Sequence, residues 1–364
     1  MDVITLLKQL IEMKSETPDD GGTLDFIAEY LFEYEAVRID KETVKNLFLY
    51  KKFGEGEHLC FAGHVDVVPS GEGWQSHPYQ AVEKEGYLYG RGAQDMKSGV
   101  AALVQTLKTT TSFNGTLSLL LTSDEEGDAK YGTQEVLRYL QTHRMLPDAV
   151  IVAEPTCEEV FGDAMKVGRR GSINGIIEKR GKQGHAAYPE KAHNPIHKVA
   201  QVLPHIAGVN LDSGDAFFSP SQFVITDIRA GMEVTNVTPG TLKMMFNVRN
   251  STKTDARSIE DFIHKYFKEM DYTLTLTQSA YPFMTDVNTK IVTLLDHAIA
   301  KVCHMEAKHS TAGGTSDARF MAPYGIDVVE FGVINDRIHA PNERTSIKEV
   351  MQLYDVFCEV VKTY

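Results

Sequence analysis

The sequence predicts an α/β fold in which a mostly parallel mixed sheet carries helices on both faces, with a smaller α+β domain inserted into it. Helix-like and strand-like segments alternate over residues 1–160, this rhythm changes near Gly168, and it resumes at Asn288. Alternating strands and helices are typical of a parallel sheet covered on both sides. The length of 364 residues suffices for two domains.

The N-terminal part supplies helices and strands in turn. Apolar residues recur at helical spacing in four segments, which are 2–13, 22–34, 98–109 and 132–143. Short apolar runs with the length of buried strands occupy 59–68, 115–123 and 149–153. After residue 288, a helix is expected to 302, a strand at 327–332 and a last helix at 346–362.

The middle of the chain has a different order of elements. Strands are expected at 172–179, 222–229, 241–250 and 272–278, with helices at 194–202 and 255–269. This βαββαβ order suits a small sheet with two helices on one face. We therefore expect a catalytic domain formed by residues 1–169 and 284–364, and an inserted domain for dimerisation or as a lid at 170–283.

Composition excludes several classes of function. The chain has 37 Lys and Arg against 50 Asp and Glu, a net charge of −13, which argues against a nucleic-acid binder. No apolar run approaches the roughly 18 residues that a membrane span needs. The N-terminus resembles an amphipathic helix and not a signal peptide. Four scattered cysteines without such a signal are expected to be reduced, so we expect a cytoplasmic protein.

Three residues with metal-binding chemistry lie near predicted strand ends or turns in the first half. His64 and Asp66 are two apart at the end of a strand, so that their side chains point the same way. A carboxylate that accepts the second ring N–H would orient a metal-bound histidine. Asp95 lies in a glycine-containing turn before a helix. Taken singly, the pair could be ordinary loop residues and Asp95 a helix N-cap.

Further acids and a histidine follow other strands. Glu125 and Glu126 come after one apolar strand, Glu154 ends another, and His339 follows a third. Each alone could be a solvated loop residue, but together they meet at the edge of the sheet where α/β proteins bind ligands. Imidazole and carboxylates without cysteine fit zinc, with cobalt or manganese as alternatives. If one carboxylate is shared, five ligands hold two ions about 3.5–4 Å apart, with one acid left as general base. The predicted chemistry is metal-assisted hydrolysis.

Several longer motifs occur in an order that resembles the co-catalytic zinc aminoacylases and carboxypeptidases. They are GHVDVVP, YGRGAQDMKSGVAAL, TSDEEG, VAEPT, RRGSI, GKQGHAAYP, NVTPGTL, GGTSDARF and INDRIHAPNE. The resemblance spans about residues 58–345. It implies that His64 and Glu154 hold one zinc, that Glu126 and His339 hold the other, and that Asp95 bridges the two.

The resemblance also assigns the remaining roles. It implies that Asp66 orients His64, that Glu125 is the general base, and that the peptide bond between Asp95 and Met96 is cis. Spacing alone does not decide which of Glu125 and Glu126 is base and which is ligand.

For the substrate, the resemblance implies a homodimer formed through the inserted domain. Two polar residues, His185 and Asn236, would act across the subunit interface, with His185 donating to the developing oxyanion. The resemblance also implies that Arg169, Arg249, Gly314 and Thr315 bind the substrate. Arginine suits this role because it binds carboxylates through two hydrogen bonds.

The reaction that the resemblance implies is hydrolysis of the amide bond of N-succinyl-LL-2,6-diaminopimelate, a small molecule, to succinate and LL-2,6-diaminopimelate. The alternatives are deacylation of another N-acyl amino acid such as N-acetylornithine, and C-terminal peptide cleavage. A more distant alternative is a binding or dimerisation protein of the same fold without activity. RRGSI and GGTSDARF favour the succinylated substrate, since a diacid needs an additional cation.

Overall fold

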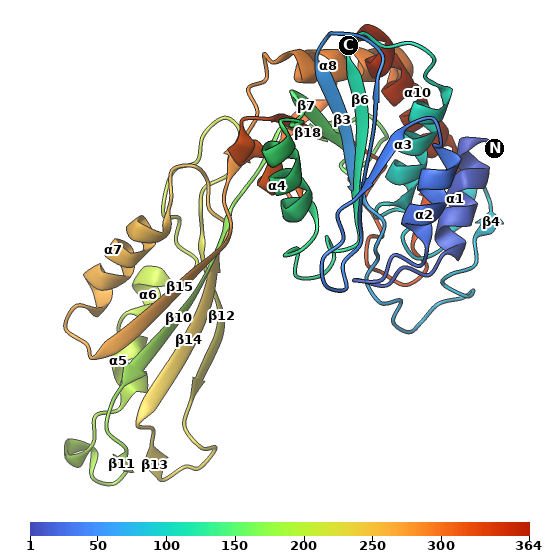
Figure 1. Cartoon of the computed structure of the whole chain (residues 1–364). Helices are drawn as coiled ribbons and strands as arrows, with labels where there is room; N and C mark the ends of the chain where they lie inside the picture. The colour runs from blue at the N-terminus through green and yellow to red at the C-terminus, as the bar shows by residue number, and fades with distance from the viewer. The chain divides into compact units, whose positions relative to one another are not determined.

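The computed structural model covers residues 1–364 and divides into two compact units (Figure 1). The major unit comprises Met1–Gly168, Met284–Ser310 and Ser316–Tyr364. The inserted unit comprises Arg169–Phe283 and Thr311–Thr315. The predicted junctions lie within one residue of these, but the prediction assigned residues 311–315 to the larger domain.

An eight-stranded mixed sheet lies at the centre of the major unit. In spatial order its strands are β1 (Glu35–Arg38), β2 (Asn46–Lys52), β6 (Thr116–Thr122), β3 (His58–His64), β7 (Ala149–Val152), β18 (Asp327–Glu330), β8 (Ala164–Lys166) and β17 (Lys308–Ser310). The central four, β6, β3, β7 and β18, are mutually parallel. β1, β2 and β8 pair antiparallel with their neighbours toward the centre of the sheet. The predicted mostly parallel α/β sheet is confirmed.

Helices cover both faces of this sheet. On one face pack α1 (Val3–Glu12), α2 (Thr23–Tyr30), α3 (Lys97–Thr109), α8 (Lys290–Cys303) and α10 (Ile347–Thr363). They share one apolar cluster with Leu47 and Leu49 of β2. On the other face, α4 (Thr133–His143) packs on β2 and β6, and α9 (Ala318–Met321), continued by a 3-10 turn at Ala322–Tyr324, packs on β18. The central strands β3, β6 and β7 lie between these two layers and are buried along almost their whole length.

A small sheet of the major unit joins distant parts of the chain. It consists of β4 (Val82–Lys84), β5 (Tyr87–Tyr89) and β19 (Arg344–Ser346), in the order β19-β5-β4. β19 pairs antiparallel with β5, so that Arg344 lies opposite Tyr89. The segment after His339 is thereby held beside the segment that leads to Asp95.

The inserted unit is an antiparallel sheet with helices on one face. The strands are β12 (Phe223–Ala230), β14 (Thr241–Val248), β10 (Ser172–Arg180) and β15 (Tyr272–Ala280), in this order. The helices α5 (Pro195–Ala200), α6 (Leu203–Ile206) and α7 (Ala256–Phe267) share one buried apolar cluster with the sheet. Short elements complete the unit and its junctions: β9 (Gly168–Arg169), β11 (Gly184–His185), a 3-10 turn at Pro189–Lys191, β13 (Val237–Thr238) and β16 (Phe283–Met284).

The predicted βαββαβ order is confirmed, since the chain runs β10, α5, β12, β14, α7, β15. No helix in either unit is both long and apolar enough to cross a bilayer.

Candidate metal centre

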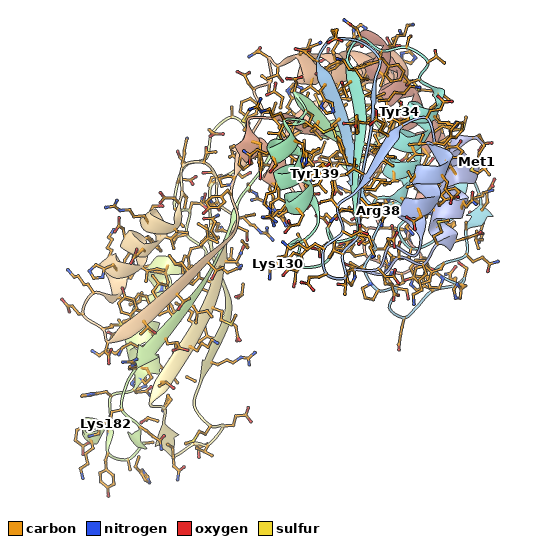
Figure 2. All side chains as sticks on the ribbon, viewed as in Figure 1. Met1, Tyr34, Arg38, Lys130, Tyr139 and Lys182 are labelled. Atoms are coloured by element: carbon orange, nitrogen blue, oxygen red, sulfur yellow. The ribbon has the colours of Figure 1, made fainter.

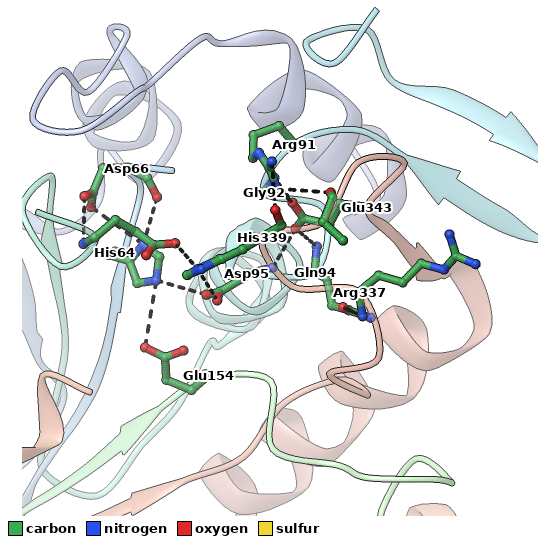
Figure 3. A network of polar contacts seen from close by, with 12 residues as sticks. His64, Asp66, Arg91, Gly92, Gln94, Asp95, Glu154, Arg337, His339 and Glu343 are labelled. Carbon is green, nitrogen blue, oxygen red and sulfur yellow. Dashed lines mark hydrogen bonds and ion pairs between the residues drawn. The ribbon is translucent and has the colours of Figure 1, made fainter. Parts of the chain in front are cut away.

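The predicted ligand residues all belong to the major unit and meet at one edge of its sheet (Figure 3). His64 is the last residue of β3, and Asp95 precedes α3. Glu126 follows β6, and Glu154 follows β7. β6, β3 and β7 are parallel neighbours, so their carboxyl ends meet at the same place. His339 joins them from the loop between β18 and β19.

Asp95 lies between the two histidines. Its Oδ1 is 3.2 Å from Nε2 of His64, and its Oδ2 is 3.5 Å from Nε2 of His339. Each histidine has a second acid nearby: Glu154 Oε1 is 3.8 Å from His64 Nε2, and Glu126 Oε1 is 3.0 Å from His339 Nε2. The two oxygens of one carboxylate thus face two separate imidazole–carboxylate pairs.

The donor atoms are close enough to surround cations. Donor atoms of His64, Glu125 and Glu154 lie within 4.8 Å of one another, and so do those of His64, Asp95 and Glu126. Imidazole nitrogen and carboxylate oxygen are ligands that Zn²⁺, Co²⁺ and Mn²⁺ accept. These side chains could therefore hold a metal ion.

The carboxylates are crowded. Burial, together with the charges of Asp317 and Glu126 and against the opposing effect of His64, raises the pKa of Glu125 to about 8. Burial, with repulsion from Asp95, also raises the pKa of Glu154 well above its usual value. Such a group of acids stays ionised only if positive charge is supplied among them.

The histidines supply that charge by binding protons. Hydrogen bonds to Asp95 and Glu126 raise the pKa of His339 to about 10. Burial opposes the charged form of His64, yet its hydrogen bond to Asp95 and the charge of Glu154 raise its pKa well above the usual value. For Asp95, the hydrogen bonds from the two histidines outweigh burial and lower the pKa. A cation bound here would replace protons on both rings.

Asp66 contacts the site in a way that differs from the prediction. Nδ1 of His64 donates to the main-chain oxygen of Asp66 at 2.8 Å, whereas the carboxylate Oδ1 is 3.6 Å away. The carboxylate instead accepts the N–H groups of Glu126 at 3.1 Å and Glu125 at 3.4 Å. Asp66 therefore fixes the ring through its backbone, leaving Nε2 to face Asp95, and fixes the turn of the two glutamates through its side chain.

Sequence reasoning missed Glu343, which holds the loop carrying Asp95. Its Oε1 accepts the N–H groups of Gln94 at 2.9 Å and Asp95 at 3.0 Å. Its Oε2 accepts Nη1 of Arg91 at 2.7 Å and the N–H of Gly92 at 3.0 Å. Arg91 and Glu343 are both 1% exposed. Glu343 is the last residue of the motif INDRIHAPNE, but no role was predicted for it, since only the pairing of β19 with β5 brings it to the loop.

Gln94 connects the same loop to the segment that carries His339. Its Nε2 donates to Asp336 at 2.7 Å, and its Oε1 accepts the N–H of Arg337 at 2.8 Å (Figure 3). No role was predicted for this side chain. The peptide bond between Asp95 and Met96 is cis, as the resemblance implied.

The predicted substrate residues all belong to the inserted unit. His185 and Asn236 lie on facing segments of the β11–β13 pair, where the Ala186 N–H donates to the Asn236 oxygen at 2.8 Å. Nη1 of Arg169 donates to the oxygens of Ala312 and Gly314, each at 3.3 Å, which ties this arginine to the turn that includes Thr315.

Two further arginines lie close together. Gly171 and Asn250 exchange backbone hydrogen bonds at 2.8 and 3.1 Å, and Arg170 and Arg249 each precede one member of this pair. Burial, together with the charge of Arg249, lowers the pKa of Arg170. Paired guanidinium groups suit anionic ligands.

Comparisons with known proteins agree with this arrangement. The family model "Peptidase family M20/M25/M40" matches residues 60–363. Two relatives named "Succinyl-diaminopimelate desuccinylase", from Nitratiruptor sp. and Sulfurovum sp., are 67% and 68% identical, cover all of this chain, and are themselves covered to 100% and 99%. Among solved structures, an aminopeptidase PepT from Bacillus cereus has a TM-score of 0.82 at 17% identity, covering 99% of this chain and 97% of its own. The last likeness concerns the fold alone.

Proposed function

This chain belongs to the peptidase family M20/M25/M40, and on that premise we propose that it hydrolyses N-succinyl-LL-2,6-diaminopimelate in the cytoplasm, releasing succinate and LL-2,6-diaminopimelate. The relatives named for this reaction match it over its full length. The observation that carries the chemistry is the placement of Asp95, whose two oxygens face two different histidines at 3.2 and 3.5 Å.

The proposed cofactors are two Zn²⁺ ions, with Co²⁺ or Mn²⁺ as possible occupants of one site. His64 and Glu154 would hold one ion, Glu126 and His339 the other, and Asp95 both. The donor set supports this assignment because His64 has Glu154 nearby and His339 has Glu126 nearby. Both histidines also face the carboxylate of Asp95. When bound, the ions would polarise the acyl carbonyl and acidify water.

Glu125 is the proposed general base. It takes a proton from the attacking water and passes it to the amine nitrogen as the amide bond breaks. Its pKa of about 8 in the metal-free chain means that it readily carries a proton near neutrality. The hydrogen bond of 3.0 Å between Glu126 and His339 supports Glu126, and not Glu125, as the ligand.

Substrate recognition would fall to the inserted unit. Arg169 and Arg249 would bind the substrate carboxylates, assisted by the Gly314–Thr315 turn. Arg169 supports this assignment because it already contacts the turn through Gly314. A guanidinium binds a carboxylate by two parallel hydrogen bonds, which gives direction as well as affinity.

We propose that the chain is a homodimer and that His185 and Asn236 act on the partner's substrate. β12 supports the dimer because it is an edge strand with exposed Val224 and Ile228, and free edges pair with other chains. Two inactive variants, Glu125→Gln and His185→Ala, test this by mixing. Hybrid dimers contain one intact site, so about a quarter of wild-type activity should return after subunit exchange. No recovery would show that His185 acts within its own protomer.

The substrate is tested by turnover of the zinc-loaded enzyme on three compounds: N-succinyl-LL-2,6-diaminopimelate, N-acetylornithine and a peptide with a free C-terminus. We expect strong preference for the succinyl compound. Preference for either of the others would retain the metal chemistry and overturn the substrate. If no compound is turned over by fully metal-loaded protein, the alternative of a non-catalytic binding protein gains support.

A further inference from the structure

The charges of the two units are opposite in sign. The inserted unit contains 14 Lys and Arg against 11 Asp and Glu, a net charge of +3. The major unit contains the remaining 23 basic residues against 39 acidic ones, a net charge of −16. The difference arises mainly from the acids, since the inserted unit comprises about a third of the chain but contains only 11 of its 50 Asp and Glu residues.

Five of the 14 cations line one cavity within the inserted unit. The cavity has a volume of about 850 Å³ and lies between the end of β10, the segment 189–202 and the end of α7. Its basic residues are Lys179, Arg180, Lys198, Lys265 and Lys268. This volume lies within the range of about 300–1,000 Å³ that is usual for small-molecule sites. Lys179 and Arg180 are the last two residues of β10, and Lys182, two residues further along the chain, is labelled in Figure 2.

None of these five cations has a carboxylate oxygen within ion-pairing distance. Elsewhere in the chain such partners are common: Lys8 pairs with Glu83 at 2.7 Å, and Lys290 pairs with Glu57 at 2.6 Å. Two acids, Glu269 and Asp271, also line the cavity, but neither forms an ion pair with its cations. The lining therefore carries an excess of three positive charges.

Lys179 makes the strongest case for a ligand. It is only 7% exposed, and its ammonium group donates to one acceptor, the main-chain oxygen of Arg180. An ammonium group has three N–H donors, and a buried charge without an anionic partner is costly. Its place in the wall of a basic cavity means that a bound anion would satisfy it.

We propose that this cavity binds a small polyanion, one with about three negative charges on phosphoryl or carboxylate groups. The charge follows from the five cations less the two acids. His193 and His197 line the same cavity and offer additional ring donors. The proposed site consists only of residues of the inserted unit, and it includes none of the metal or substrate residues described above.

The test is calorimetric titration of the full-length chain with two probes, inorganic tripolyphosphate and citrate. The double variant Lys198→Gln/Lys265→Gln removes two exposed cations of the cavity, so that the fold should persist. Lys243→Gln is the matched control, since Lys243 is exposed on β14 and does not line the cavity. Both probes chelate metals, so metal content is matched among the variants.

We expect one polyanion per chain, with affinity that falls as salt rises. The double variant should bind about a hundredfold more weakly, because each lost charge-assisted bond is worth roughly a factor of ten, and Lys243→Gln should bind as the wild type does.

Binding of tripolyphosphate alone would identify a phosphoryl ligand, and binding of both probes would identify a site that selects ligands by their charge. Equal weakening in Lys243→Gln, or no binding at low salt, overturns the proposal. The proposal is also overturned if the double variant no longer self-associates but binds the anion as the wild type does, because Lys198 and Lys265 would then contact a second copy of the chain.

Discussion

Replacing Glu343 by Gln should weaken both the fold and metal binding, although Glu343 is not itself a proposed ligand. In the variant, the amide oxygen can still accept the N–H groups of Gln94 and Asp95. The amide NH₂ would then face Arg91 Nη1 and the Gly92 N–H, two donors that Glu343 Oε2 accepts at 2.7 and 3.0 Å in the native protein. Breaking one partner of a buried ion pair costs about 3–5 kcal/mol. Because Arg91 retains Ser70 O at 3.0 Å, we expect the lower end, about 3 kcal/mol.

Two measurements separate the consequences of this change. Urea denaturation of the metal-free protein gives the loss of unfolding free energy, and competition with a chelating dye gives metal affinity. Loosening the loop that carries Asp95 should weaken metal binding about 10–100-fold, as is usual when the groups that orient a ligand are changed. Asp336→Asn is the control, since Asp336 contacts the same loop through the Gln94 side chain but is partly exposed. Unchanged metal affinity in a destabilised Glu343→Gln protein would refute the positioning role.

Three further outcomes are expected. Glu125→Gln should lower turnover by about 10²–10⁴-fold or more while metal content stays the same, and loss of metal would instead make Glu125 a ligand. In the metal-free protein, hydrogen bonds to Asp95 and Glu126 raise the pKa of His339 to about 10. Its stabilising effect should therefore be complete below about pH 6.5 and vanish as the pH rises through about 10; an NMR midpoint near the ordinary value would contradict this. Asp66→Asn should cost about 1–3 kcal/mol of unfolding free energy at pH 8, because the Glu126 N–H loses its acceptor. That difference should grow as the pH falls through about 6, the raised pKa of the buried Asp66, because the folded wild type then takes up a proton that the unfolded chain does not, whereas the Asn variant does not titrate. An equal cost at both pH values would be inconsistent with this.

The sequence was sufficient for the parts of the fold that depend on local pattern. The parallel centre of the sheet and the βαββαβ order follow from the periodicity of apolar residues. Placement of the acids at one sheet edge follows from the rule that parallel strands end together. Spacing could not separate Glu125 from Glu126, since the two are adjacent and chemically alike; the proposed assignment depends on the hydrogen bond between His339 and Glu126.

What pattern could not predict depends on contacts between distant segments. Gln94 and Glu343 act through partners more than 200 residues away, and no local motif encodes such a pairing. Asp66 was expected to orient His64 with its carboxylate, but a shorter contact through its own main chain takes that place. A backbone acceptor is available at every residue, so side-chain chemistry gives no sign of which one is used.

The distance along the chain between Glu343 and the loop it holds has a consequence for synthesis. The ribosome makes Glu343 about 250 residues after Gly92–Asp95, and β18, which lies between β7 and β8 in the sheet, is also made long after that loop. Chains grow at about 5–20 residues per second, so the loop waits on the order of 10–50 seconds for its carboxylate anchor. Until then the nascent chain has a sheet without one of its inner strands and an unanchored Asp95. Metal capture should therefore follow the synthesis of Glu343 and not the folding of the N-terminal part of the sheet alone.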